Sequence, residues 1–158
     1  MGINLADMSE IQAPVDGILT SERRKVRERR LDRALIKVKV DDRLLPYIER
    51  TLDASGVTWL NVRSFAKTDA IPSWKVNNYL TAWAERSGFK RFTFKAARHS
   101  FASIARNVCK IDAKTVDECL DHAGNMKLAD VYIKKDFSLL WEANKTVLDL
   151  FNWPSFEK

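Results

Sequence analysis

The spacing of apolar residues changes near Asp41, and this change limits the possible folds more than any other feature of the chain. Upstream, the segment "ALIKVKV" alternates Ile36, Val38 and Val40 with lysines, which is the period of a half-buried strand. Downstream, apolar residues recur three and four positions apart, which is typical of amphipathic helices. We therefore expect a mostly helical α+β fold, in which a small antiparallel β-hairpin or sheet packs against a helical bundle.

The limits of the expected elements follow from this periodicity and from turn residues. A short amphipathic piece comes first, and Pro14 with Asp16 and Gly17 marks a turn after it. Two strands are expected, at about 18–26 and 34–40. The expected helices all lie beyond residue 40, and they cover residues 41–56, 72–87, 95–108, 112–120, 126–135 and 138–151.

Size and composition are those of one soluble globular domain, with 158 residues, 46% hydrophobic and 30% charged. No apolar run approaches the roughly 20 residues that span a bilayer, and the first residues do not resemble a signal peptide. We expect a single domain over residues 1–158, a cytoplasmic location and no membrane partner. Cys109 and Cys119 have no companions at metal-ligand spacing, so we expect two reduced, structural thiols, no metal and no cofactor.

The charge of the chain favours a polyanionic partner. Lysine and arginine outnumber aspartate and glutamate by 27 to 21, which gives a formal net charge of +6. The excess is concentrated in "RRKVRERRLDR", residues 23–33, which connects the two expected strands. A solvated charged hairpin would explain this run, so the run alone does not identify the partner.

Three groups of polar residues interrupt the apolar helix faces. The first is Lys95 with Arg98 and His99, the second is His122 in "LDHAG", and the third is Tyr132 in "LADVYIKKD". Each has an ordinary structural explanation, because an arginine can cap carbonyls, a histidine suits a helix C-terminus and a tyrosine can lie in a core with its hydroxyl bonded. Their order and spacing, taken together, favour a functional site instead.

This order and spacing resemble the C-terminal catalytic domain of tyrosine recombinases, the phage-integrase family. The family box H/K-x-x-R-H-[ST]-F-A is matched by "KAARHSFA" at residues 95–102. The family motif L-G-H is matched by "LDH" at residues 120–122, with Asp121 in place of glycine. The nucleophilic tyrosine of the family is matched by Tyr132, ten residues after His122, where nine is the commonest spacing. The resemblance implies the catalytic-domain fold of that family.

The resemblance extends more loosely to the beginning of the chain. "GINLADM" resembles the family segment G-[LMI]-R-x-x-E-[LI], with Asn4 where the first active-site arginine is expected. A branch of the family on bacterial mobile and conjugative elements resembles this chain in lacking that arginine. The hairpin that carries the catalytic lysine of the family is best matched at Lys25. We hypothesise that a guanidinium from Arg23, Arg24 or Arg27 replaces the missing one.

The resemblance implies an enzyme that cleaves and rejoins DNA at specific sites through a covalent 3′-phosphotyrosine, without a metal, in the integration or recombination of a mobile element. Tyr132 would attack the phosphodiester, while Arg98 would donate two parallel hydrogen bonds to its oxygens. His122 would donate a further one. Lys95 lies three residues before Arg98, on the same side of the helix, and Lys25 is the candidate general acid.

The partners implied are double-stranded DNA and further copies of the chain, in a tetrameric synapse on DNA. The residues expected to contact DNA lie in the basic hairpin, and they are Arg23, Arg24, Arg27, Arg29 and Arg30. Helix 138–151 either packs within its own chain or docks on a neighbouring copy, and Trp153 and Phe156 beyond it slightly favour the second. His99 points about 100° away from the preceding arginine, so we expect an orienting or buried structural residue.

Family members also carry an N-terminal core-DNA-binding domain, which has no counterpart in residues 1–158. This suggests a truncated piece of a longer recombinase, located in the bacterial cytoplasm with the nucleoid. Such a piece should bind DNA weakly and with a steep dependence on salt.

Three interpretations remain open. The first is the catalytic domain of a recombinase, and the second is a DNA-binding module of the same descent that no longer cuts, for which Asn4 is the best argument. The third is an unrelated helical protein with a basic hairpin, in which Lys95, Arg98, His122 and Tyr132 would be scattered in space. A tyrosine-based topoisomerase shares the chemistry, but the chain has no extended DNA-clamping region.

Overall fold

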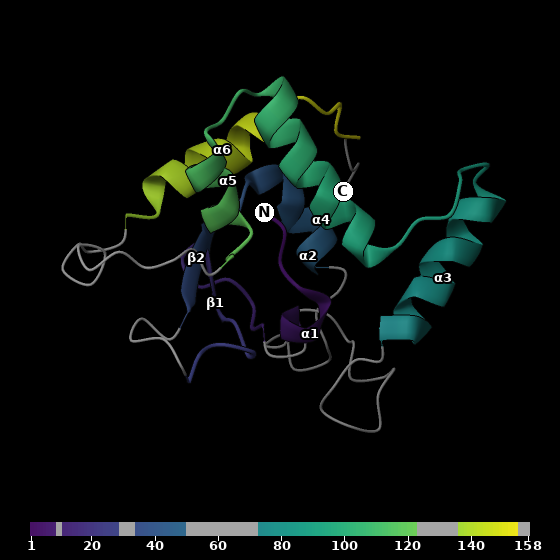
Figure 1. Ribbon diagram of the computed structural model, residues 1–158, viewed down its shortest axis with the longest axis horizontal. Helices are drawn as coiled ribbons and strands as arrows, with labels where there is room; N and C mark the ends of the chain where they lie inside the picture. Colours follow the sequence, from purple (N-terminus) through teal and green to yellow (C-terminus); the bar gives the residue numbers. More distant parts are fainter. Residues whose placement is uncertain (9–10, 29–33, 50–72, 123–135, 155–158) are drawn as a thin grey trace.

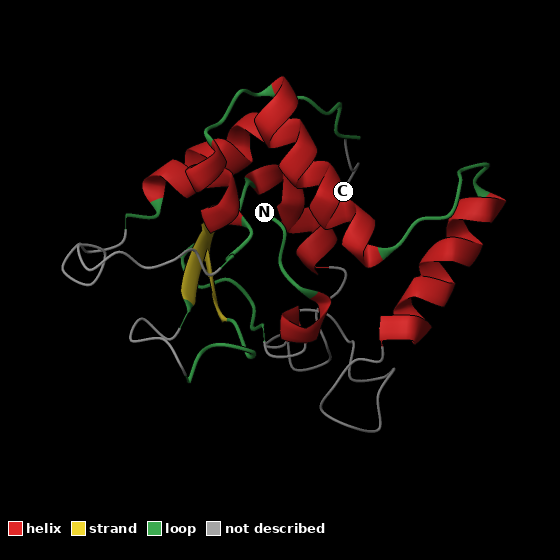
Figure 2. Ribbon diagram, in the orientation of Figure 1, coloured by secondary structure: helices red, strands yellow, loops and turns green. Residues whose placement is uncertain are grey.

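The chain folds as a mixed α+β structure with one small sheet (Figure 1, Figure 2). The computed structural model describes residues 1–8, 11–28, 34–49, 73–122 and 136–154. A short helix, α1 (Leu5–Met8), precedes the two strands, and the remaining elements are helical. Within the described part of the chain, no helix is both long and apolar enough to cross a membrane.

The sheet has the alternation that the sequence predicts. Strand β1 (Ile18–Glu22) pairs antiparallel with β2 (Leu35–Lys39), with Leu19 opposite Val38. Ile36 and Val38 of β2 are buried and its two lysines are exposed, so the predicted period of two is confirmed. The buried face packs against α1 and against Ile48, and this forms a core around the sheet.

The first strand is shorter than predicted. It ends at Glu22 rather than near residue 26, because the arginine-rich run begins with a helical turn. The amides of Val26 and Arg27 donate to the carbonyl of Arg23 at 3.1 and 2.9 Å. The turn redirects the chain at Arg23, so the basic run leaves the sheet instead of extending it.

The helices agree closely with the periodicity of the sequence where they are described. A 3₁₀ turn, η1 (Asp42–Leu44), leads into α2 (Leu45–Glu49) behind the cap of Asp41, whose carboxylate accepts from the amide of Arg43. The predicted end of that segment at Gly56 and the predicted helix 126–135 lie outside the described residues. The other helical elements are α3 (Ser73–Arg86), α4 (Phe94–Ser103) with its π-helical continuation η3 (Ile104–Val108), α5 (Ala113–Cys119) and α6 (Ser138–Leu148).

Helices α4, α5 and α6 gather on one side of the molecule beside the sheet, whereas α3 stands apart from them (Figure 1). The apolar faces of α5, α6 and η3 share a core that includes Val116, Leu120 and Val147. The indole of Trp141 in α6 donates to the carbonyl of Lys37 at 2.7 Å, which joins this layer to β2. Sheet and helices therefore meet through α6.

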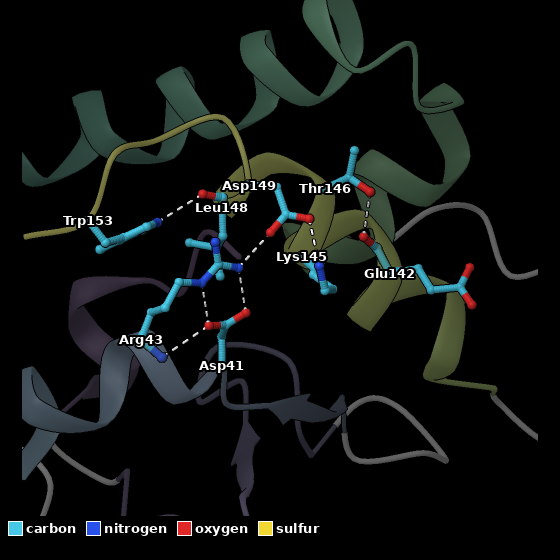
Figure 3. A network of polar contacts seen from close by, with 8 residues as sticks. All are labelled: Asp41, Arg43, Glu142, Lys145, Thr146, Leu148, Asp149 and Trp153. Atoms are coloured by element: carbon cyan, nitrogen blue, oxygen red, sulfur yellow. Dashed lines mark hydrogen bonds and ion pairs between the residues drawn. The ribbon is translucent and has the colours of Figure 1, made fainter. Parts of the chain in front are cut away.

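The segment after α6 folds back on its own chain (Figure 3). Arg43 donates to the carboxylates of Asp41 and Asp149, with Nε–Oδ1 at 2.6 Å and Nη2–Oδ1 at 2.7 Å respectively. The ring of Trp153 lies edge-on to Tyr47, with centroids 6.1 Å apart. Helix α6 buries Leu140, Ala143 and Val147 within its own chain, and docking of this segment on a neighbouring copy stays a prediction.

Candidate functional site

Five segments that are distant in sequence line one small cavity. They contribute Asn4 from the N-terminal segment, Arg23 from the end of β1, Ile36 from β2, Arg98 from α4 and Asp121 from the end of α5. The sequence motifs named Arg98 and the turn at residue 121 independently, 23 positions apart, and the fold brings them to one place. The chemistry of this cavity depends on its two guanidinium groups.

Arg98 holds two of these segments together. Its helix begins at the cap of Thr93, whose hydroxyl accepts from the amide of Ala96 at 3.2 Å. Its Nη1 donates to the carbonyl of Gly2, and its Nη2 donates to the carbonyl of Leu120. A Cβ on Gly2 would lie 2.9 Å from Cγ of Arg98 and 2.7 Å from Cδ2 of Leu120, so the close approach requires glycine.

Arg23 is the second guanidinium at the cavity. Its Nη1 donates to the carbonyl of Asp121, and its buried Nε has no hydrogen-bond partner among the described residues. Burial lowers the pKa of Arg98, and the neighbouring charge of Arg23 lowers it further. The carboxylates of Asp121 and Asp7, both buried, act in the opposite direction. Two cations and two anions therefore share this part of the interior.

Asn4, the position at which the resemblance leads one to expect an arginine, lines the same cavity. Of the three hairpin arginines that we considered as replacements, Arg23 also lines it, whereas Arg24 and Arg27 do not. Arg24 is exposed, and its backbone amide donates to Asp7 Oδ1 at 3.1 Å. The geometry thus favours Arg23 among the three candidates.

His122 follows the cavity residue Asp121 directly. Asp121 has a φ of 49°, which turns the chain out of α5. The imidazole of His122 is 48% exposed, and its Nδ1 lies 3.1 Å from Oδ1 of Asp117. A histidine is thus held on the outer side of the same helix end that Arg98 binds through the carbonyl of Leu120.

The structure does not bring every predicted residue to the cavity. Lys95 and Lys25 are exposed and do not line it. His99 is also exposed, because its face of α4 points to solvent, so it is not the buried structural residue that was one of the two expectations, and the orienting role stays a prediction. The predicted nucleophile, Tyr132, and two of the predicted DNA contacts, Arg29 and Arg30, lie outside the described residues.

Both cysteines are free thiols. Cys119 is buried at the cavity, and burial raises its pKa to about 11, so it is neutral at physiological pH. Among the described residues, no three histidine, cysteine or acidic side chains are close enough to hold a metal ion.

Sequence reasoning missed the acidic residues of the site. Asp7 and Asp121 are buried beside the arginines, and Asp117 contacts His122. For Asp117 a signal was present, because it stands five residues before His122 across a helix end. For Asp7 the signal was absent, since its burial depends on contacts with the distant hairpin.

The chain matches no protein-family model, no curated protein and no solved structure.

Proposed function

We propose that this chain is the catalytic domain of a site-specific tyrosine recombinase, which cleaves and rejoins DNA through a 3′-phosphotyrosine in the movement of a mobile element. One observation carries the proposal. The family motifs pick out three features separately, namely Arg98, the Leu120–His122 turn and the basic hairpin. Hydrogen bonds from Arg98 to Leu120 and from Arg23 to Asp121 join these three features. An arginine that caps a helix end is common in unrelated proteins, so it is the meeting of all three features that supports the proposal.

The proposed reaction uses side chains for each chemical requirement. The phenolic oxygen of Tyr132 loses its proton to solvent and attacks the phosphorus, forming the phosphotyrosine bond while the bond to the 5′ oxygen breaks. Arg98 and His122 stabilise the charge that grows on the non-bridging oxygens. Lys25, exposed beyond β1, gives a proton to the departing 5′ hydroxyl. Lys95, exposed in the first turn of α4, contributes positive charge towards DNA.

Arg23 takes the place of the arginine that is missing at Asn4 in this scheme. The two residues line the same cavity, and Arg23 lies close enough to Arg98 to lower its pKa. A second guanidinium beside Arg98 would bind a phosphate through more donors than one arginine provides. The unpartnered Nε of Arg23 is a donor that such a ligand would satisfy.

The alternative is a DNA-binding module of the same descent that no longer cuts. Two observations favour it, namely the asparagine at position 4 and the engagement of both terminal nitrogens of Arg98 by backbone carbonyls. The net charge of +6 suits either function.

The deciding experiment is covalent trapping on nicked duplexes whose crossover site has been selected from a random-sequence pool by binding to the chain. We expect the wild type to form a protein–DNA adduct that survives denaturant and Tyr132→Phe to form none. Tyr79→Phe is the matched control, because Tyr79 is an exposed tyrosine of α3 and its loss should leave adduct formation unchanged.

The other outcomes distinguish the alternatives. Binding that weakens steeply with salt, without any adduct from the wild type, would support the binding module and contradict the enzyme. An adduct that persists in Tyr132→Phe would contradict the assignment of the nucleophile.

A further inference from the structure

The hydrogen bonds at the C-terminal end of α5 bring the side chains of Asp117 and His122 together. The amide of Asp121 donates to the carbonyl of Glu118 at 2.9 Å, and the amide of His122 donates to the carbonyl of Asp117 at 3.0 Å. These two bonds, with a positive φ at Asp121, are the Schellman motif. In this motif the third residue from the helix end commonly contacts the second residue beyond the cap, and here those residues are Asp117 and His122.

The contact fixes which ring nitrogen carries hydrogen. Oδ1 of Asp117 lies 3.1 Å from Nδ1 of His122, within hydrogen-bond distance. An ionised carboxylate can only accept, so Nδ1 must be the donor. We propose that Asp117 is a positioning residue, which holds His122 in the Nδ1–H form and leaves Nε2 as the atom available to a ligand.

The catalytic consequence rests on the proposed function. If His122 contacts the scissile phosphate, it does so through Nε2, and it donates from that atom after taking up a second proton. Asp117 then acts through His122 by fixing the ring plane and the tautomer, as carboxylate partners do for metal-binding histidines. The exposure of both side chains, 48% for His122 and 62% for Asp117, leaves room for DNA to approach the ring.

Imidazole nitrogen NMR tests the tautomer without any DNA. The chain has only two histidines, so the spectrum is assigned by comparison with His99→Gln. At about pH 9, where histidines are ordinarily neutral, we expect His122 of the wild type to be protonated at Nδ1. In Asp117→Ala the population should shift towards the Nε2–H form. Glu118→Ala is the matched control, since it removes a carboxylate one residue away and should leave the tautomer unchanged.

The spectrum of the wild type is sufficient to overturn the proposal. An Nε2–H ring at His122, or the same tautomer in the wild type and in Asp117→Ala, would show that the carboxylate does not position the ring. These outcomes are independent of DNA cleavage, so they are separate from a failure of the recombinase assignment.

The trapping assay tests the catalytic consequence. Asp117→Ala should slow adduct formation by about 10- to 100-fold, the range found when the carboxylate partner of a functional histidine is removed. When His122 is already replaced by alanine, adding Asp117→Ala should not slow adduct formation further, because the carboxylate no longer has a ring to position. Adduct formation at the wild-type rate in Asp117→Ala would overturn the positioning role.

Discussion

Asp121 has two roles, because its backbone turns the chain out of α5 and its carboxylate is buried at the cavity. Its φ of 49° lies in the left-handed region, which glycine adopts freely and aspartate tolerates better than most residues. The resemblance places a glycine at this position, and a glycine would adopt this φ without strain. The side chain that replaces it here is buried near Arg98, where its charge offsets that of the guanidinium.

A pair of substitutions separates these two contributions of Asp121. Asp121→Gly and Asp121→Ala both remove the carboxylate, but only alanine is strained at a φ of 49°. We expect the glycine variant to be more stable by about 1 kcal/mol in urea unfolding. The same pair at Glu118, inside α5, should show the reverse order, because glycine is unfavourable within a helix. Equal stabilities at position 121 would contradict the role of the backbone.

Arg23 is the residue for which the structure adds most to the catalytic hypothesis. We expect Arg23→Ala to slow adduct formation by about 100-fold, the usual cost of losing a donor to a developing negative charge. Arg23→Lys should restore little of the rate, because an ammonium does not reproduce the fork of donors. Arg86→Ala, which removes an exposed arginine of α3 that neither lines the cavity nor belongs to the basic hairpin, should leave the rate nearly unchanged.

Arg23 also bonds to the carbonyl of Asp121, so urea unfolding of each variant is needed beside the rate. If Arg23→Ala remains folded and retains the wild-type rate, the replacement hypothesis is wrong.

Helix α4 is the element on which the site depends most. It carries the segment "KAARHSFA" over most of its length, and its start is fixed by the hydroxyl of Thr93 and by the amide oxygen of Asn77, which accepts from the amide of Phe94 at 2.9 Å. Local rules place this helix well, since a threonine followed by an apolar segment predicts an N-cap. They do not show that Arg98 turns inward to Gly2 while His99 faces solvent.

The cap of α4 can be tested on its own. Thr93→Ala should lower the free energy of unfolding by about 1 kcal/mol, because the amide of Ala96 loses its acceptor. Thr93→Ser keeps a hydroxyl at the same place and should recover most of the loss. Urea unfolding followed by circular dichroism measures both, and an alanine variant as stable as the serine variant would exclude a role for the cap.

At the scale of the whole molecule, stability depends on the meeting of α4, α5 and α6. Leu140 of α6 is completely buried, and Cys119 of α5 and Phe101 of α4 belong to the same core. This core lies beside the cavity, because Cys119 lines both. Loss of packing here should therefore loosen the end of α5 that Arg98 and Arg23 hold.

Two adjacent leucines provide a matched test. Leu140→Ala should cost about 2–5 kcal/mol in urea unfolding, a large part of the 5–15 kcal/mol typical of a domain. Leu139→Ala removes the same atoms from a side chain that is 57% exposed, so it should cost less than about 1 kcal/mol. Similar losses at both positions would mean that α6 does not pack as described.

Local patterns were sufficient for the fold class and for most helix limits. The alternation in β2 and the caps of α4 and α5 involve residues within a few positions of one another, so they can be read from the chain itself. Motif spacing likewise picks out Arg98 and His122 as site residues before any contact is known, although whether they act on DNA stays a prediction.

The arrangement of the residues at the cavity depends on contacts between segments that are distant in sequence. Which arginine of the basic run reaches the cavity depends on the turn that ends β1 and on a carbonyl 98 positions away in the chain. The burial of Asp7 and the inward direction of Arg98 likewise depend on partners in distant segments. Such pairings arise from the packing of helices against the sheet, and no periodicity within one segment encodes them.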